Sequence, residues 1–283
     1  MTATEIITQV KDLPVVSETA RKLASQLSQP DLHRDEIVET VRFDSVLTAK
    51  LLRVCNSAGS GVREPVVSVD QAILILGDNA IFRMVCAIGF GGALGLAAAG
   101  YDNEANDLWT HSLSAGIGSE YLVEVESYGH FLPSAAFTAG LLHDIGKTVI
   151  SKALTPQMRT EIRSKISSNP ASRMEVERAV LGTDHCEVGA CLLQRWAFPD
   201  LIIEAVANHH SPLTKPAIQL SAVIYLANRA VLHSDRSDGW EQRLAAANKT
   251  SAEVLGMDVG KVERLMSGIH EAMQTLPHFE AAA

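Results

Sequence analysis

The apolar residues of this chain recur at helical spacing over most of its length, and this pattern constrains its fold more than any other feature. In residues 14–29 the apolar positions follow the 3-4 spacing that places them along one side of a helix: Val16, Ala20, Leu23 and Leu27. Strand-like alternation is scarce, as expected where only 5% of the residues are aromatic. The sequence therefore predicts an all-α fold.

Helix start and stop signals support the same prediction. Short helices are expected over residues 34–41 and 44–55, and Asp44 stands at the N-cap position of the second. Ser68 followed by Gln71 is a capping-box pattern that opens the next helix, and Gly77 is placed to end it. A further helix is expected to begin near Asp78, and helical patterns return from residue 216 towards the end of the chain.

Residues 84–100 (MVCAIGFGGALGLAAAG) contain no charge and could be read as a membrane span. Gly91 and Gly95 form a G-x-x-x-G pair of the kind that membrane helices use. However, the segment is shorter than the roughly 20 residues that a span requires, consists largely of Gly and Ala, and has no second span beside it. We expect a closely packed core helix and no membrane role.

A polar stretch at residues 101–107 (YDNEAND) is the best candidate for a boundary inside the chain. We expect an N-terminal helical subdomain over residues 1–100. Residues 101–283 are then expected to form a second helical subdomain, which holds most of the histidines and continues into C-terminal helices. No internal repeat and no low-complexity segment interrupts this organisation.

Composition narrows the function classes. A chain of 283 residues with 47% hydrophobic residues has ample material for a buried core. Its net charge of −9 opposes nucleic-acid binding, which depends on cationic side chains. The four cysteines form no C-x-x-C pair, and the first residues have neither the basic nor the apolar region of a leader. These features predict a cytoplasmic protein with free thiols.

Six side chains are candidate metal ligands because His and carboxylate donors together suit Fe, Mn, Zn or Ni better than Ca. They are His111, His143, Asp144, His185, His209 and His210. Adjacent residues such as His143 and Asp144 lie about 100° apart on a helix, so both can reach one or two metals in a groove between helices. The pattern permits shared ligation without proving it.

Each candidate also has a simpler structural explanation. A lone histidine on an apolar helix is more often a hydrogen-bonded core residue than a ligand, and His111 could be a polar residue near a helix start. His209 and His210 lie just before Ser211 and Pro212, where a helix should end and the helix dipole favours histidine.

His185 could belong to a helix cap together with Asp184. The thiol of Cys186 is expected to pack as a small apolar group rather than to ligate or react. Lys147 could meet a phosphate, although an exposed lysine after a helical turn is the simpler interpretation.

The combination and order of these motifs resemble the HD superfamily and, within it, the HDOD family, the HD-related output domain of bacterial signal-transduction proteins. The resemblance covers about residues 12–230. DSVLTAKLLRVCNSAGSG (44–61) and VSVDQAILILG (67–77) are similar to the N-terminal half of that family, which catalytic HD domains lack. FTAGLLHDIGK, GTDHCEVGACLLQRWAFPD and AVANHHSP are similar to its second half. The resemblance implies an N-terminal helical bundle packed on an HD-like helical core.

In catalytic HD domains an early histidine, the His-Asp pair and a later Asp bind a metal that activates water against a phosphoester. By resemblance the early histidine is His111 and the pair is His143 and Asp144. His185, His209 and His210 match the additional histidines of HD-GYP phosphodiesterases, and Asp144 and Lys147 are the candidate catalytic residues. A bound metal lowers the pKa of its water and neutralises phosphate oxygens, so this ligand set is chemically reasonable.

Two departures weaken the catalytic interpretation. The final Asp of the catalytic pattern is replaced by Asn228, and a neutral amide is a poorer metal ligand than a carboxylate. The segment after the double histidine (HHSPLTKP) lacks the acidic residue and the GYP triplet of HD-GYP enzymes.

The sequence therefore favours a regulatory output module that acts through protein partners without catalysis. The resemblance implies receiver, GGDEF, EAL or kinase modules as those partners, and a nucleotide is a further candidate ligand. The alternative is a metal-dependent phosphohydrolase that acts on a nucleotide or a cyclic dinucleotide.

Overall fold

The computed structural model confirms the all-α prediction: the residues that it describes form helices and connecting turns, without a strand. The described residues are 1–10, 13, 16–26, 34–56, 64–95, 105–126, 131–168, 173–211, 219–232, 249, 253 and 258–274. The polar residues 101–104 and the segments 96–100 and 233–248 lie outside them.

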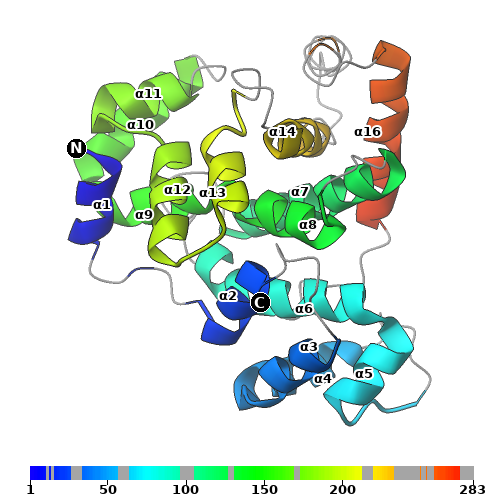
Figure 1. Ribbon diagram of the computed structural model, residues 1–283. Coiled ribbons are helices and arrows are strands. Elements are labelled where there is room, and N and C mark those ends of the chain that lie inside the picture. The colour runs from blue at the N-terminus through cyan, green and yellow to red at the C-terminus, as the bar shows by residue number, and fades with distance from the viewer. Residues whose placement is uncertain are drawn as a thin grey trace.

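The first part of the chain consists of short helices followed by one long helix. In order they are α1 (Ala3–Gln9), α2 (Glu18–Gln26), α3 (Arg34–Arg42), α4 (Ser45–Cys55), α5 (Val69–Leu76) and α6 (Asp78–Gly95). In Figure 1, α3, α4 and α5 lie together below α6, and α6 runs between this group and the rest of the molecule. Helix α1 stands apart from them and packs against α9 and α12 of the second part.

The cap residues predicted from the sequence are confirmed. The Asp44 side chain accepts a hydrogen bond from the backbone N–H of Leu47 at the start of α4. Ser68 accepts from the N–H of Gln71, and the Gln71 side chain in turn accepts from the N–H of Val67, one residue before the position that a standard capping box uses. Gly77 ends α5 with a positive φ of 84°, which favours glycine.

The second part of the chain supplies the remaining helices. They are α7 (Ala105–Glu126), α8 (Pro133–Leu142), α9 (Ile145–Ala153), α10 (Pro156–Ser168), α11 (Arg173–Leu181), α12 (His185–Arg195), α13 (Asp200–Ala207), α14 (Gln219–Leu232) and α16 (Val259–Gln274). Helix α7 is central to this part and packs against α6, α8, α14 and α16. Helix α12 packs against both α9 and α13.

The apolar segment at 84–100 is described as far as residue 95, where it forms the second half of α6. Phe82 and Phe90 on this helix are buried in the core, as the packed-helix prediction requires. Among the described residues no helix is both long enough and apolar enough to cross a membrane.

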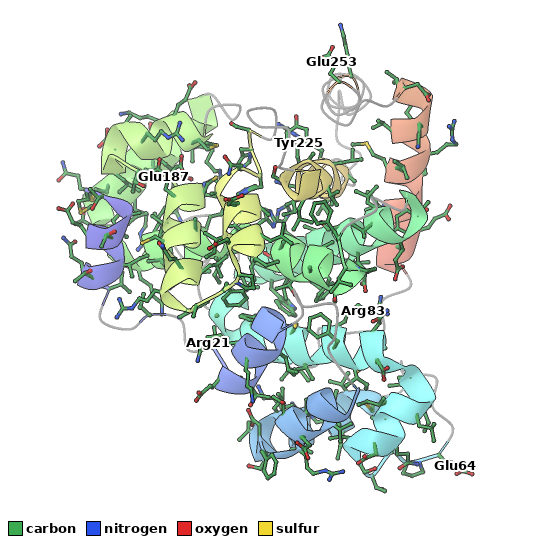
Figure 2. All side chains as sticks on the ribbon, viewed as in Figure 1. Arg21, Glu64, Arg83, Glu187, Tyr225 and Glu253 are labelled. Atoms are coloured by element: carbon green, nitrogen blue, oxygen red, sulfur yellow. The ribbon has the colours of Figure 1, made fainter. Side chains whose placement is uncertain are left out.

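An ion pair joins the two parts of the chain. Arg83 of α6 places its Nη1 3.1 Å from a carboxylate oxygen of Glu120 on α7, and the Glu120 side chain is only 2% exposed. Figure 2 shows Arg83 on the side of α6 that faces the second part. The division at residues 1–100 and 101–283 remains a prediction, since α1 packs with the second part and α6 contacts both.

Two glycines allow the helices of the second part to approach closely. A Cβ atom at Gly140 of α8 would lie 2.7 Å from the carbonyl oxygen of Ala115 on α7. A Cβ atom at Gly146 of α9 would collide with the carbonyl oxygen of His185 on α12. The candidate ligands on α7, α8, α9 and α12 are brought together at these close contacts.

Candidate metal centre

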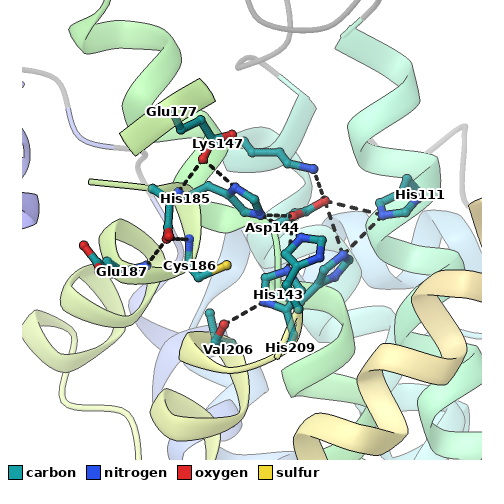
Figure 3. Close-up of polar contacts among 12 residues, drawn as sticks. His111, His143, Asp144, Lys147, Glu177, His185, Cys186, Glu187, Val206 and His209 are labelled. Carbon is teal, nitrogen blue, oxygen red and sulfur yellow. Dashed lines mark hydrogen bonds and ion pairs between the residues drawn. The ribbon is translucent and has the colours of Figure 1, made fainter. Parts of the chain in front are cut away.

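The six side chains predicted as ligands come from four separate places in the fold and meet at one point. His111 lies on α7, His143 and Asp144 join α8 to α9, His185 is the first residue of α12, and His209 and His210 follow α13. Figure 3 shows Asp144 in the middle of this group, with imidazole rings on both sides of it. A chance arrangement of core histidines does not explain this convergence.

His143 and Asp144 occupy a junction between helices rather than two positions of one helix. His143 is the C-cap of α8, and Asp144, with φ −100° and ψ 10°, is the N-cap of α9. The expectation that both lie about 100° apart on one helix is therefore wrong. The change of chain direction lets both side chains point to the same place, which a continuous helix would not allow.

The two carboxylate oxygens of Asp144 face different histidines. Oδ2 lies 3.2 Å from Nε2 of His143 and 3.4 Å from Nε2 of His111. Oδ1 lies 3.4 Å from Nε2 of His185 and 3.7 Å from Nε2 of His209. Asp144 thus stands between two groups of nitrogens, and its side chain is 1% exposed.

Three of the imidazoles are held by their Nδ1 atoms. Nδ1 of His143 donates to the carbonyl oxygen of Gly140, and Nδ1 of His209 donates to that of Val206, at 2.6 and 2.7 Å. Nδ1 of His185 donates to the carboxylate of Glu177 at 2.7 Å. In the neutral form each ring therefore turns an unprotonated Nε2 towards Asp144. Lone pairs that face a carboxylate repel it unless a cation lies between them.

Glu177 belongs to the site although the sequence did not single it out. It lies on α11, is fully buried, and accepts hydrogen bonds from both the backbone N–H and the Nδ1 of His185. Carboxylates that orient a histidine in this way are common behind metal ligands. In the sequence it is one of several charged residues in RMEVERAVL and carries no distinguishing signal.

Lys147 contacts the same carboxylate from the first turn of α9. Its Nζ lies 2.6 Å from Oδ2 of Asp144, and its side chain is 13% exposed, so it is not the exposed surface lysine of the simpler interpretation. Burial would raise the pKa of the Asp144 carboxyl, but the adjacent His143 and Lys147 hold that pKa well below its usual range. Asp144 is therefore an anion, and the Lys147 ammonium places one positive charge beside its Oδ2.

Three of the histidines, His111, His209 and His210, have pKa values below the usual range of an imidazole. Burial lowers the pKa of His111, and burial together with His210 lowers the pKa of His209 well below its usual range. The pKa of His210 falls to about 3, mainly through burial and secondly through its neighbour His185. These rings are neutral near pH 7, which is the form that binds metals.

The donor atoms fall into two groups able to hold a metal. In the first, one atom each from His111, His143 and Asp144 lie within 4.8 Å of one another. In the second group, one atom each from His185, His209, His210 and Cys186 also lie within 4.8 Å of one another. Oδ1 of Asp144 and Nε2 of His209 are buried without a hydrogen-bond partner. These two orphaned atoms fit a bound cation, which would satisfy both.

Comparisons with known proteins show the family and support the fold. A profile of the HDOD domain matches residues 13–212. The chain belongs to the HDOD family. An HDOD domain protein of unknown function from Geobacter sulfurreducens has a similar fold, with a TM-score of 0.77 and 22% identity over 98% of this chain and 96% of that one. A protein from Shewanella amazonensis with the provisional name of a phosphohydrolase has a TM-score of 0.72 and 23% identity over 98% of both chains.

An uncharacterised protein of Treponema pallidum is 24% identical over 245 residues, which are 85% of this chain. The chain spans 46% of the length of that relative. The profile match shows the HDOD family, and the solved structures support the fold.

Asn228 stands at the position where the resemblance to catalytic HD domains leads us to expect a last Asp. Asn228 of α14 is 5% exposed, and its Oδ1 is buried without a hydrogen-bond partner. An amide cannot supply the negative charge of the Asp that it replaces. Within the six predicted ligands Asp144 is the sole carboxylate.

Proposed function

We propose that this HDOD domain is a signal-transduction module that holds divalent metal in its HD-type centre and acts on other proteins rather than on a substrate. The observation that carries the proposal is the position of Asp144 between two groups of imidazoles. Each of its oxygens faces two Nε2 atoms at 3.2 to 3.7 Å, in a place that water barely reaches. A cation in each group would be held by these nitrogens and by the Asp144 oxygen that faces them.

The donor set supports two metals that share Asp144. His111, His143 and Oδ2 would hold the first, and His185, His209, His210 and Oδ1 would hold the second. Nitrogen donors combined with one carboxylate suit Fe, Mn, Zn or Ni. A carboxylate that bridges two ions balances charge at both with a single anion.

The regulatory interpretation rests on charge and access. Two divalent ions bring four positive charges, and the six ligands offer one carboxylate against them. Four of the six ligands are almost fully buried: His143, Asp144, His185 and His209. A phosphoester needs an open coordination position, and this centre provides little room for one.

A phosphohydrolase is the second candidate, because one edge of the site is accessible. His111 is 17% exposed, His210 is partly buried, and the Lys147 ammonium lies beside them. A bound metal would supply Lewis-acid chemistry and an activated water, and Lys147 could pair with a phosphate of a nucleotide or a cyclic dinucleotide.

Metal analysis of protein purified without a histidine tag tests the proposal. We expect close to two equivalents of divalent metal per chain and no turnover of bis-p-nitrophenyl phosphate or cyclic dinucleotides with added Mn²⁺ or Fe²⁺. Turnover that His143→Ala abolishes in a folded protein would establish the phosphohydrolase instead. A chain that binds no metal under any of these conditions would overturn both candidates.

We infer that the partner is a protein because apolar side chains protrude from the N-terminal helices. Phe43 is 86% exposed and Leu74 is 75% exposed, and Val46 and Val67 are also exposed. These four residues, here named the apolar patch, lie on or directly beside α3, α4 and α5, and the ion pair between Arg42 and Asp70 joins α3 to α5. Exposed apolar side chains on neighbouring helices favour a protein contact, and the net charge of −9 opposes a nucleic acid.

Receiver, GGDEF, EAL and kinase modules from the same organism are the partners to test. We expect Phe43→Ser and Leu74→Ser each to weaken such a complex while the fold is retained. Val125→Ser is the matched control, because Val125 is exposed on α7, outside the apolar patch. Equal binding by all three variants would contradict the role of the patch.

A further inference from the structure

Cys186 lies inside the second group of ligands, where the sequence suggested only packing. It is the second residue of α12 and is 1% exposed. Its Sγ belongs to the set of atoms, with one nitrogen each from His185, His209 and His210, that lie within 4.8 Å of one another. Figure 3 shows the sulfur on the side of Cys186 that faces the histidines.

We propose that the Cys186 thiolate is a ligand of the second metal, which makes that site a three-nitrogen, one-sulfur centre for Zn²⁺ or a similar borderline ion. The inference rests on the proposed metal centre and adds the donor that determines which ion the second site selects. Four donors from His and Cys are a usual complement for zinc, and the shared Asp144 oxygen would be a fifth.

A second observation points to a ligand at this place. Nε2 of His209 is buried without a hydrogen-bond partner, and the Nδ1 bond to Val206 leaves it unprotonated. A histidine that only filled space in the core would turn this nitrogen towards a donor. Instead His209 directs it into the group that contains the Cys186 sulfur.

Local structure holds the sulfur in position. Asp184, the N-cap of α12, accepts hydrogen bonds from the backbone N–H groups of Cys186 and Glu187 at 2.9 and 3.0 Å. His185 is fixed at the same helix start by Glu177. The first turn of α12 therefore presents a nitrogen and a sulfur together, and the turn after α13 presents the other two nitrogens.

The two metal positions then differ in chemistry. The first offers two nitrogens and a carboxylate oxygen, which suit Fe²⁺ or Mn²⁺, whereas a thiolate at the second favours Zn²⁺ and disfavours Mn²⁺. The thiolate also adds one negative charge to a centre that is short of anions. A site whose coordination positions are filled by protein donors in this way would hold its metal for structure or sensing, in line with the regulatory function.

Cobalt substitution tests this assignment directly on the full chain. Co²⁺ takes tetrahedral sites that Zn²⁺ prefers, and a thiolate ligand produces an intense sulfur-to-cobalt absorption in the near ultraviolet, besides the weaker visible bands of the ion. We expect that absorption in the wild type and its loss in Cys186→Ala and in Cys186→Ser. We also expect Zn²⁺ to bind at least about tenfold more weakly to both variants, with Mn²⁺ binding unchanged.

Cys191→Ser is the matched control, because Cys191 lies on the same helix and its Sγ is near the Thr4 hydroxyl, outside the group of ligands. It should keep the near-ultraviolet band. Cobalt that binds with visible bands but without thiolate absorption would overturn the role of Cys186 and leave the metal centre standing. Failure of the folded wild type to bind cobalt, zinc or manganese would overturn the proposed function as well.

Discussion

A single carboxylate oxygen of Glu177 accepts both the backbone N–H and the Nδ1 of His185, at 2.8 and 2.7 Å. These two hydrogen bonds fix the position of the His185 ring and its tautomer, so that Nε2 faces Asp144 and His210. Glu177 lies on α11 and is not itself a predicted ligand, so we expect it to act on the centre by positioning His185.

Glu177→Ala is therefore expected to weaken metal binding by about 10- to 100-fold, the usual cost of losing a partner that orients a ligand. Glu177→Gln, which retains an acceptor oxygen, should recover part of that affinity. Isothermal titration calorimetry with Zn²⁺ on folded, metal-free protein measures both. Glu175→Ala is the control, because Glu175 is exposed on the same helix. Equal affinities for all of these proteins would show that Glu177 does not position His185.

Asp144 is expected to be the one ligand whose loss empties both metal positions. Asp144→Asn keeps the size of the side chain but removes the charge that both groups of nitrogens share. The metal content of Asp144→Asn, measured by inductively coupled plasma mass spectrometry, should fall towards zero equivalents per chain. It should be lower than the metal content of Glu177→Ala. Asp200→Asn, an exposed change in the first turn of α13, should leave the metal content unaltered. Retention of one full equivalent in Asp144→Asn would argue against a shared carboxylate.

The packing of α9 against α12 gives a third prediction. A methyl group at Gly146 would collide with the carbonyl oxygen of His185 and approach the backbone nitrogen of Gly189 to 2.7 Å, and backbone atoms cannot move aside as a side chain can. Gly146→Ala should therefore lower the free energy of unfolding by about 1–3 kcal/mol and displace His185, with a loss of zinc affinity. Chemical denaturation and zinc titration measure the two effects.

Gly92→Ala is the matched control, since a Cβ atom at this helical position of α6 meets nothing within 4 Å. There the removal of a glycine from a helix should raise stability by up to about 1 kcal/mol. If the two variants change stability in the same direction, close packing at Gly146 is not the reason for its glycine.

Local signals in the sequence were sufficient to predict several parts of this structure. Asp44 and Ser68 could be assigned as caps because a helix start depends on the side chain at that position and on its near neighbours. The histidines and Asp144 could be proposed as one site because their residue types and order match a known pattern. Their convergence depends on the packing of α7, α8, α9, α12 and α13, for which the sequence predicted an all-α fold without the bounds of these helices.

Other parts depend on tertiary contacts that no local pattern encodes. Glu177 looks like any charged residue of a surface helix until α11 packs against α12 and buries it. LLHDIGK contains no proline, and no residue at the break between α8 and α9 has a positive φ. The sequence therefore predicts a continuous helix through His143, where the structure has a junction. Similarly, α13 ends at Ala207, before the predicted stop at Pro212, and this earlier end frees His209 and His210 to turn towards Asp144.

The ion pair between α6 and α7 gives a prediction about pH. Burial raises the pKa of Glu120 from 4.5 to about 7, although Arg83 opposes this change and Glu124 adds to it. Between pH 4.5 and 7 the folded chain therefore holds this proton more tightly than the unfolded chain, so the stability that Glu120 contributes is lost as the pH rises through that range. A pKa change of this size lowers the free energy of unfolding by at most about 3 kcal/mol, at about 1.4 kcal/mol per pKa unit.

Glu120→Gln mimics the protonated side chain and should remove this dependence. We expect the variant and the wild type to have similar free energies of unfolding near pH 4.5, and the variant to be the more stable by up to about 3 kcal/mol near pH 7.5. Urea denaturation across this range measures the difference, in which contributions from the site histidines cancel because both proteins share them. Glu175→Gln, an exposed change on α11, should follow the wild type throughout. A variant that is less stable than the wild type near pH 7.5 would mean that Glu120 is ionised in the folded chain throughout this range and is stabilised by Arg83.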